Sequence, residues 1–367
     1  MHIDFHNTKL RLLAVSVLLV TASGCGGSND SEPTTEATPE PTVTATPEPT
    51  VTPEPTVTPE PTVTPEPTTT EAEGLDFANF LAGSIVGDVT EVECTLTNGT
   101  VTSCYQFTTT GDPIDHDVGP FCPDTIDEGA EAGGKWIENG TLVDISGEYI
   151  TTLSTVYNDS EWDRLFDINT REVFQVTGDN CAAAAQLNPP EEFWYTCIDC
   201  TIEDFGGVVE QTFTIPVVPV PRDTIAELGN DFPGVALNGL LLSFPADLDG
   251  IIATYNIAAI DDCGGHVNNA ESYHYHGANG CSHEIEQVDH APLIGYAMDG
   301  YALYSMTDAD GVEPTDLDEC RGHTDTDRGY HYHATSPSEN SFIGCFHGET
   351  VFEENAGGPP GGGPPGG

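Results

Sequence analysis

Short hydrophobic runs alternate with turn residues through most of this chain. Between residues 74 and 355 the runs are rich in β-branched and aromatic residues, and Gly, Pro, Asn or Asp interrupts them at short intervals, a pattern typical of strands. The clearest runs are 213–218, 235–242 and 293–304. The pattern predicts a single, mainly β domain over 74–355, with a β-rich α+β fold as the alternative.

Turn residues inside this region predict two hairpins. Asp299-Gly300 divides the run 293–304, and Asn98-Gly99 lies between Cys94 and Cys104. Both dipeptides favour the tight turns that join antiparallel strands. Helical stretches are few and short, near Phe77–Leu81, Glu161–Phe166 and Ala182–Leu187. No internal boundary is clear, although a division near residue 205 is an option.

The first 24 residues have the features of a secretory signal. Lys9 and Arg11 precede an apolar run at 12–20, and small residues then lead to Cys25. The ending Ala22-Ser23-Gly24-Cys25 resembles the lipobox of bacterial lipoproteins, in which the cysteine becomes the lipidated first residue. The sequence predicts an exported lipoprotein anchored to the cell envelope through Cys25, with ordinary secretion as the alternative. In a Gram-negative host, Gly26-Gly27 favours the outer membrane, on either its periplasmic or its extracellular side.

Residues 25–73 predict a tether between the lipid and the domain. Thr-Pro-Glu-Pro-Thr recurs five times between Thr38 and Thr68. Alternate prolines remove hydrogen-bond donors and fix φ, so we expect an extended polyproline II stalk without a packed core. The Gly- and Pro-rich tail at 356–367 is expected to be disordered as well.

The charge of the chain excludes one class of partner. Lys and Arg number 8 against 61 Asp and Glu, and the formal net charge is −53. Nucleic-acid binding requires clustered basic residues and is therefore excluded, whereas cations are attracted. Asp-x-Asp-Gly occurs at 247–250 and 308–311, but neither copy has the glutamate that completes a calcium loop, so both are interpreted as turns.

Ten cysteines follow Cys25, an even number that indicates disulfides in an exported chain. We expect Cys94 to pair with Cys104 across the predicted hairpin. Cys197 and Cys200 have the spacing of a redox motif, but no strand leads into a helix there, so a structural bond is favoured over thiol exchange.

A histidine motif occurs twice with identical spacing. Asp-x-Cys-x-Gly-His-x6-Tyr-His-Tyr-His runs over 261–276 and again over 318–333, and nine of the twelve histidines lie between His266 and His347. Each copy also has one cysteine before its histidines and one after them. We therefore expect Cys263–Cys281 and Cys320–Cys345 to close a loop over each motif.

Strand geometry explains what the paired histidines can do. Successive side chains of a strand point to opposite faces, so His274 and His276 share one face and the tyrosines share the other. Imidazoles at this spacing can converge on one ion, and Asp261, Asp262 and Asp318 are the expected acceptors for their second nitrogens. The predicted ligands are His274, His276, His331 and His333, with His266, His323 and His290 as further candidates. The two copies either share one ion or hold one each.

These segments resemble the YHYH domain family of exported bacterial proteins. The matching pieces are 262–266, 273–276, 290–300, 317–320, 329–334 and 343–348, so that the resemblance covers about 233–350, and 111–122 looks like the extension of longer members. His347 stands where relatives usually carry Arg. The resemblance implies a fold and an exported location, but no activity.

Three functions remain open at this point. The first is a surface-tethered lipoprotein that binds copper or zinc, because imidazole suits these ions when the cysteines are oxidised. The second is a metal-dependent hydrolase or oxidase in which His290, Asp299 or His116 acts as a base. The third is a structural or adhesive module whose histidines are packed. Protein partners are not indicated.

Overall fold

Strands dominate the part of the chain that the structure describes. The computed structural model describes residues 74–352 except 187, 229 and 230. Of the described residues, 34% are strand and 16% helix, and they belong to one compact unit, which agrees with a mainly β domain. The predicted signal, lipidated Cys25, repeat tether and Gly/Pro tail lie outside the described residues.

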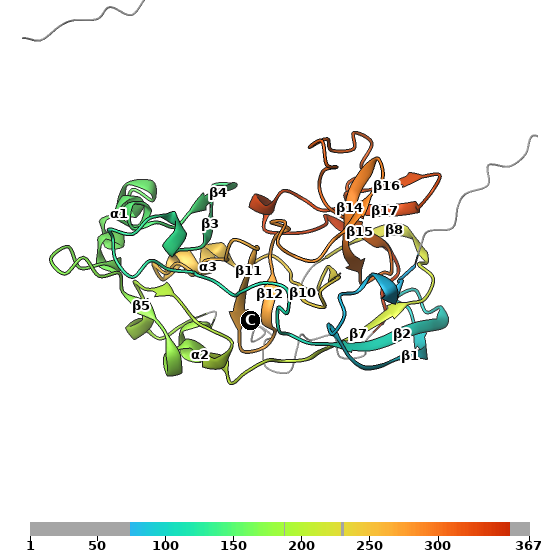
Figure 1. Cartoon of the computed structure of the whole chain (residues 1–367), viewed down its shortest axis with the longest axis horizontal. Helices are drawn as coiled ribbons and strands as arrows, with labels where there is room; N and C mark the ends of the chain where they lie inside the picture. The colour runs from blue at the N-terminus through green and yellow to red at the C-terminus, as the bar shows by residue number, and fades with distance from the viewer. Residues whose placement is uncertain (1–73, 187, 229–230, 353–367) are drawn as a thin grey trace, which may run out of the picture. The chain divides into compact units, whose positions relative to one another are not determined.

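The elements are short throughout (Figure 1). The strands are β1 (Ile85–Thr95), β2 (Val101–Thr109), β3 (Lys135–Glu138), β4 (Thr141–Asp144), β5 (Gln175–Val176), β6 (Cys197–Ile198), β7 (Gln211–Pro216), β8 (Pro221–Glu227), β9 (Gly234–Ala236), β10 (Leu241–Leu242), β11 (Gly265–Asn268), β12 (Ser272–Tyr275), β13 (Ile285–Gln287), β14 (His290–Ala297), β15 (Ala302–Tyr304), β16 (Gly322–Asp325), β17 (Gly329–His333) and β18 (Cys345–Gly348). The α-helices are α1 (Gly147–Val156), α2 (Cys181–Ala184) and α3 (Leu248–Ala253). Single 3₁₀ turns occupy Phe77–Asn79, Ala130–Ala132, Ser160–Leu165, Gly178–Asn180, Glu191–Phe193, Glu203–Phe205 and Pro337–Glu339.

The largest sheet is built from two equivalent halves. Its strand order is β11-β12-β10-β9-β14-β15-β17-β16, with β13 paired to β14. In the first half β10 is parallel to β12 and β11–β12 is a hairpin; in the second half β15 is parallel to β17 and β16–β17 is a hairpin. The antiparallel pair β9–β14 joins the halves. The histidine motif seen twice in the sequence therefore belongs to a larger structural duplication.

A second sheet of three strands, β1-β2-β7, packs over its own apolar core. Phe107 on β2 and Phe213 on β7 stack with ring centroids 5.5 Å apart, and Tyr296 from the large sheet lies in the same core. The main core collects the fully buried side chains of Trp136, Trp162 and Tyr332 among many others. Burial of such large apolar surfaces supplies most of the favourable free energy of folding.

The turns predicted from Asn-Gly and Asp-Gly dipeptides are present in the structure. The hairpin β14–β15 turns at Asp299-Gly300, and β1–β2 turns after Leu96, with Asn98 and Gly99 in the loop. The run 235–242 divides into β9 and β10 because Asn238-Gly239 is a turn, in which Gly239 has a φ of +86°. Both Asp-x-Asp-Gly segments are local structures: Asp247 caps α3, and Asp308 accepts from the Gly311 N–H in a turn.

Helices were the less predictable elements. The three predicted stretches are a 3₁₀ turn at 77–79, a 3₁₀ helix at 160–165 and the short helix α2. The longest helix, α1, was not predicted, because its Ile, Val and Thr residues have low helix propensity. The Ser146 side chain accepts from the Tyr149 N–H and caps α1, while Ile150 and Leu153 are buried. Packing against the core therefore stabilises a segment of weak intrinsic preference.

Five disulfides connect the described cysteines. Cys94–Cys104, Cys263–Cys281 and Cys320–Cys345 are the pairs expected from the sequence. The other two pairs are Cys122–Cys197 and Cys181–Cys200.

Cys197 and Cys200 therefore form structural bonds, but not with each other. Cys197 lies in the main core, whereas Cys200 belongs to a small separate cluster with Cys181 and Val176. Non-local packing of this kind is not visible in a local spacing.

Candidate metal centres

The first hairpin of the large sheet brings three histidines together. His266 on β11 is the cross-strand partner of His274 on β12, and His276 follows two residues later on the same face. The Nε2 atom of His276 lies 3.1 Å from that of His274 and 3.1 Å from that of His266. The motif spacing thus has a simple structural cause: His266 faces His274 across a tight hairpin. We call His266, His274 and His276 the first centre.

The second hairpin repeats this arrangement and adds a fourth ring. His323 on β16 pairs across the strands with His331 on β17, and His333 lies on the same face. The first residue of β14, His290, contributes the fourth imidazole. The His331 Nε2 atom lies 3.0 Å from that of His290 and 3.0 Å from that of His323. These four residues form the second centre.

The seven predicted ligands thus gather in two groups. Within each group the candidate ligand atoms all lie within 4.8 Å of one another, and each group could hold a metal ion. A single four-histidine site built from His274, His276, His331 and His333 is not what the structure contains. The sequence was compatible with one site shared by the two copies or one site in each copy. The structure has a separate group of histidines in each copy.

The hydrogen bonds at the other ring nitrogens fix the tautomers. A backbone carbonyl can only accept, so an Nδ1 atom beside one carries the proton. His274 donates to Ser272 at 3.0 Å, and in the second centre His331 donates to Gly329 and His333 to Ser305, each at 3.0 Å. His290 likewise donates to the Ala291 carbonyl at 3.0 Å.

His323 completes this pattern with a carboxylate in place of a carbonyl. Its Nδ1 atom lies 2.9 Å from Asp316 Oδ1, which accepts the ring N–H. All four Nε2 atoms of the second centre therefore present lone pairs to one another. The Nε2 atom of His333 is buried without a hydrogen-bond donor.

A cation resolves the mutual repulsion of these lone pairs. Two imidazole nitrogens on one zinc ion, at metal–nitrogen distances of about 2.0–2.1 Å, lie about 2.9–3.4 Å apart for bond angles between a right angle and the tetrahedral angle. The observed separations of 3.0 and 3.1 Å fall in that interval. The chemistry of the donors and their spacing thus fit a transition metal.

Protons are poor competitors for the same positions. Burial lowers the pKa of His274 and of His331 to about 4, and that of His266 and of His333 to about 3. Burial also holds the pKa of His276 well below its ordinary value. At neutral pH these rings are neutral, the form in which imidazole binds metals.

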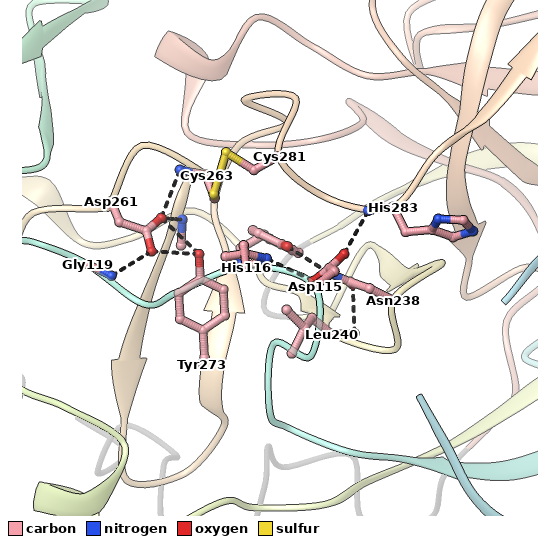
Figure 2. A network of polar contacts seen from close by, with 12 residues as sticks. Asp115, His116, Gly119, Asn238, Leu240, Asp261, Cys263, Tyr273, Cys281 and His283 are labelled. Carbon is pink, nitrogen blue, oxygen red and sulfur yellow. Dashed lines mark hydrogen bonds and ion pairs between the residues drawn. A yellow bond between two sulfur atoms is a disulfide. The ribbon is translucent and has the colours of Figure 1, made fainter. Parts of the chain in front are cut away.

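The aspartates have a different role from the predicted one. Asp261 accepts from the Tyr273 hydroxyl and from backbone N–H groups of its own turn (Figure 2). Asp318 does the same for Tyr330 in the second copy, and Asp262 pairs with Lys135. The expectation that these carboxylates support the imidazoles was wrong, because the aspartates lie on the tyrosine face of each hairpin. Backbone carbonyls support four of the imidazoles instead, and the carboxylate of Asp316 supports that of His323.

The tyrosine faces also receive the residues considered as catalytic bases. Figure 2 shows His116 bonded to Asp115, which also accepts from Asn238 and from the His283 N–H. The His116 ring packs edge-on against Tyr273.

The equivalent face of the second copy is built from Asp299 and His347. Asp299 accepts from the Tyr332 hydroxyl, and His347 stacks on Tyr330 with ring centroids 3.7 Å apart. His116 and Asp299 thus lie behind the strands that carry the ligands, while His290 is itself a member of a centre.

Glu271 was missed by sequence reasoning. Its Oε2 atom lies 3.2 Å from His274 Nε2, and its side chain is 6% exposed. Burial raises its pKa above the ordinary value. The one signal in the sequence was that Glu271 lies three residues before His274. It is one of the six residues between His266 and Tyr273 that the motif leaves unspecified.

Comparison with known proteins gives a family assignment. No curated protein and no solved structure matches the chain. Residues 212–316 match the family described as YHYH protein, a segment that includes the first centre and His290 but ends before the second motif at 318–333. The expected extent of 233–350 therefore differs from the match at both ends. On this match, the chain carries a domain of the YHYH family.

Proposed function

We propose that this protein is exported and binds two transition-metal ions, copper(II) or zinc, one in each histidine centre. The observation that carries the proposal is the set of Nε2 atoms that face one another at 3.0–3.1 Å in both centres. In a packed structural cluster each of these nitrogens would need a hydrogen-bond donor. Carbonyl and carboxylate acceptors already hold the Nδ1 protons in the second centre, so the rings have no proton left to share.

The identity of the ion follows from the donor set. All ten described cysteines are oxidised in disulfides, so thiolate ligands are absent from the described part of the chain. Imidazole suits zinc and copper(II), whereas calcium and magnesium prefer oxygen ligands. Four imidazoles around one ion match the closed tetrahedral coordination that is typical of structural zinc.

Metal uptake by the purified, metal-stripped protein tests this proposal. We expect calorimetry and elemental analysis to give two equivalents of zinc or copper per chain. His276→Ala and His333→Ala should each lose one equivalent, whereas His283→Ala, a matched change outside both centres, should keep both. Free ion at 100 times Kd should stabilise the fold by about 2.7 kcal/mol. A stripped protein that folds and takes up neither ion would disprove the proposal.

The location is part of the same proposal. Disulfides and membership of the YHYH family support export, and none of the described helices is long and apolar enough to cross a membrane. We infer that acyl chains on Cys25 hold the domain at the cell envelope, with the repeat segment as its tether. Cys25→Ala should transfer the protein from the membrane fraction to the soluble fraction. Continued membrane retention of that variant would refute the anchor and leave metal binding untouched.

A further inference from the structure

The two halves of the large sheet correspond position by position. The Tyr273 hydroxyl donates to Asp261, as Tyr330 does to Asp318 at the same offset of 57 residues. At the turn between the inner strands, Asn238 bonds the Tyr275 hydroxyl and Asp299 bonds the Tyr332 hydroxyl. Because the supporting hydrogen bonds are equivalent in the two halves, a difference between the centres can be assigned to the few residues that differ.

The first difference concerns the fourth imidazole. His290, at the start of β14, closes the second centre. Within the described residues, the first centre contains three histidines and no fourth. The second centre thus has the full complement for a four-coordinate ion, and the first lacks one nitrogen.

The second difference is a reversal of charge in the hairpin turn. Glu271 in the first copy corresponds to Arg328 in the second, and Asn268 corresponds to Asp325. The Arg328 guanidinium forms an ion pair with Asp325 of the same turn at 2.6 Å. Glu271 accepts from Asn268 Nδ2 at 2.9 Å, and its Oε2 atom lies 3.2 Å from His274 Nε2. At this turn position, a carboxylate thus faces a ligand Nε2 atom in the first centre but not in the second.

The contact between Glu271 and His274 is incomplete without a third species. His274 Nδ1 donates to the Ser272 carbonyl, so the Nε2 atom that faces Glu271 at 3.2 Å has a lone pair. Unless a proton or a cation lies between them, the oxygen lone pairs of Glu271 and the nitrogen lone pair of His274 repel each other. A protic or positively charged group between or beside them satisfies both.

We propose that the first centre keeps one coordination position open for a small exogenous donor beside Glu271, while His290 closes the second centre. Three histidines with one free position are the ligand set of catalytic zinc centres, and four protein ligands are that of structural ones. The donor is a molecule of one to three atoms, such as water or a small anion, because the centre is largely buried. This inference rests on the proposed metal binding.

Azide titration of the cobalt(II)-loaded protein tests the proposal. Cobalt(II) replaces zinc and absorbs visible light, and azide changes the absorption when it takes a free coordination position. We expect two cobalt ions and one azide per wild-type chain. His290→Ala, or His290→Gln if the alanine variant folds poorly, should raise the count to two azides. Glu271→Gln should bind azide about tenfold more tightly, because a nearby negative charge is removed. Arg328→Gln, its matched control, should leave the count at one.

The outcomes separate this inference from the function on which it rests. Absence of cobalt uptake by folded protein refutes metal binding itself. Uptake of two cobalt ions with no azide bound, or with two azides bound by the wild type, overturns the open position at the first centre. An unchanged azide affinity in Glu271→Gln overturns the role of this carboxylate.

Discussion

Successive side chains of a strand point to opposite faces, so the tyrosines and the histidines of each Tyr-His-Tyr-His motif have different roles. The histidines face a candidate metal centre, and the tyrosines face the core, where their hydroxyl groups bond buried acids such as Asp261. Tyr273 and Tyr332 are fully buried. The tyrosines thus hold the strand in place and the histidines carry the chemistry.

The glycine before each first histidine allows the tyrosine ring to lie close to the neighbouring strand. A Cβ added at Gly322 would overlap the phenol of Tyr330. This phenol is held by Asp318 at 2.9 Å and by the stacked ring of His347, so it cannot move freely. We predict that Gly322→Ala destabilises the protein by about 1–3 kcal/mol, measured by denaturant unfolding.

A second variant tests whether overlap with the Tyr330 ring causes this loss of stability. In Tyr330→Ala the overlapping ring is gone, so adding Gly322→Ala should cost clearly less than in the wild type. An equal cost in both backgrounds would show that the tyrosine is not the cause.

At this scale the sequence predicted which histidines gather in the structure but not the groups that support their rings. The histidines follow from a period of two, which is a local property of strands. The partners of the imidazoles are backbone carbonyls such as that of Ser305, contributed by a loop 28 residues away in the chain. Glu271 likewise becomes significant only once the hairpin turns it toward His274. Such contacts depend on tertiary structure and leave no pattern in the sequence.

Each hairpin is closed by a disulfide next to its ligands. Cys263 lies three residues before His266, and its partner Cys281 lies five after His276, at a sequence separation of 18 between the cysteines. Removing a disulfide that closes a loop of this size lowers the free energy of unfolding by about 3 kcal/mol, because the unfolded chain gains conformational entropy. We predict that Cys263→Ser with Cys281→Ser lowers Tm and also weakens zinc binding at the first centre at least tenfold.

The Cys94–Cys104 bond provides the matched control. It closes the β1–β2 hairpin, which lies in another sheet and contributes no histidine to either centre. Removing it should lower Tm without changing either zinc affinity. Equal effects of both double variants on zinc binding would mean that general destabilisation, rather than the local loop, controls the first centre.

Among the elements, local hairpins could be predicted and distant pairings could not. Turn chemistry at Asp299-Gly300 predicts β14–β15 directly. The parallel contact of β10 with β12 joins residues more than 30 positions apart and has no sequence signal. The bonds of Cys197 and Cys200 have the same origin, since the two side chains enter different cores.

Duplication organises the large sheet as a whole. Each half consists of four strands, one of them from the β9–β14 pair, with the same order and the same hairpin, and each half builds one centre. The two copies have nevertheless diverged at the fourth ligand and at Glu271. A single fold thus presents two unlike sets of donors.

The buried imidazoles make the stability of the metal-free protein sensitive to acid. In the unfolded chain they titrate near pH 6.5, whereas burial lowers the pKa of His266, His274, His331 and His333 to about 3 or 4. Between these values the unfolded state binds more protons, so stability is lost as the pH falls. Over pH 7.5 to 6 the loss is about 0.8 kcal/mol for each fully buried ring.

Acids with a raised pKa act in the opposite direction and at lower pH. Burial raises the pKa of Asp299 to about 6, so its protonation adds stability as the pH falls through that value and offsets only about 0.4 kcal/mol of the imidazole effect by pH 6. The interval from pH 7.5 to 6 therefore reports on the imidazoles. We expect the Tm of the stripped protein to fall steadily across it in a calorimeter, and a constant Tm would contradict the burial of neutral rings.

Zinc should raise Tm by the same amount at pH 7.5 and at pH 6. His274, His331 and His333 bind almost no protons in this interval, because burial holds the pKa of His274 and His331 near 4 and that of His333 near 3. Protons therefore do not compete with the ion until the solution is far more acidic. Exposed histidines with an ordinary pKa near 6.5 would lose much of their affinity over the same interval. Thermal scans at fixed free zinc distinguish the two cases: a zinc-induced shift that shrinks markedly by pH 6 would mean that the ligands are exposed to solvent.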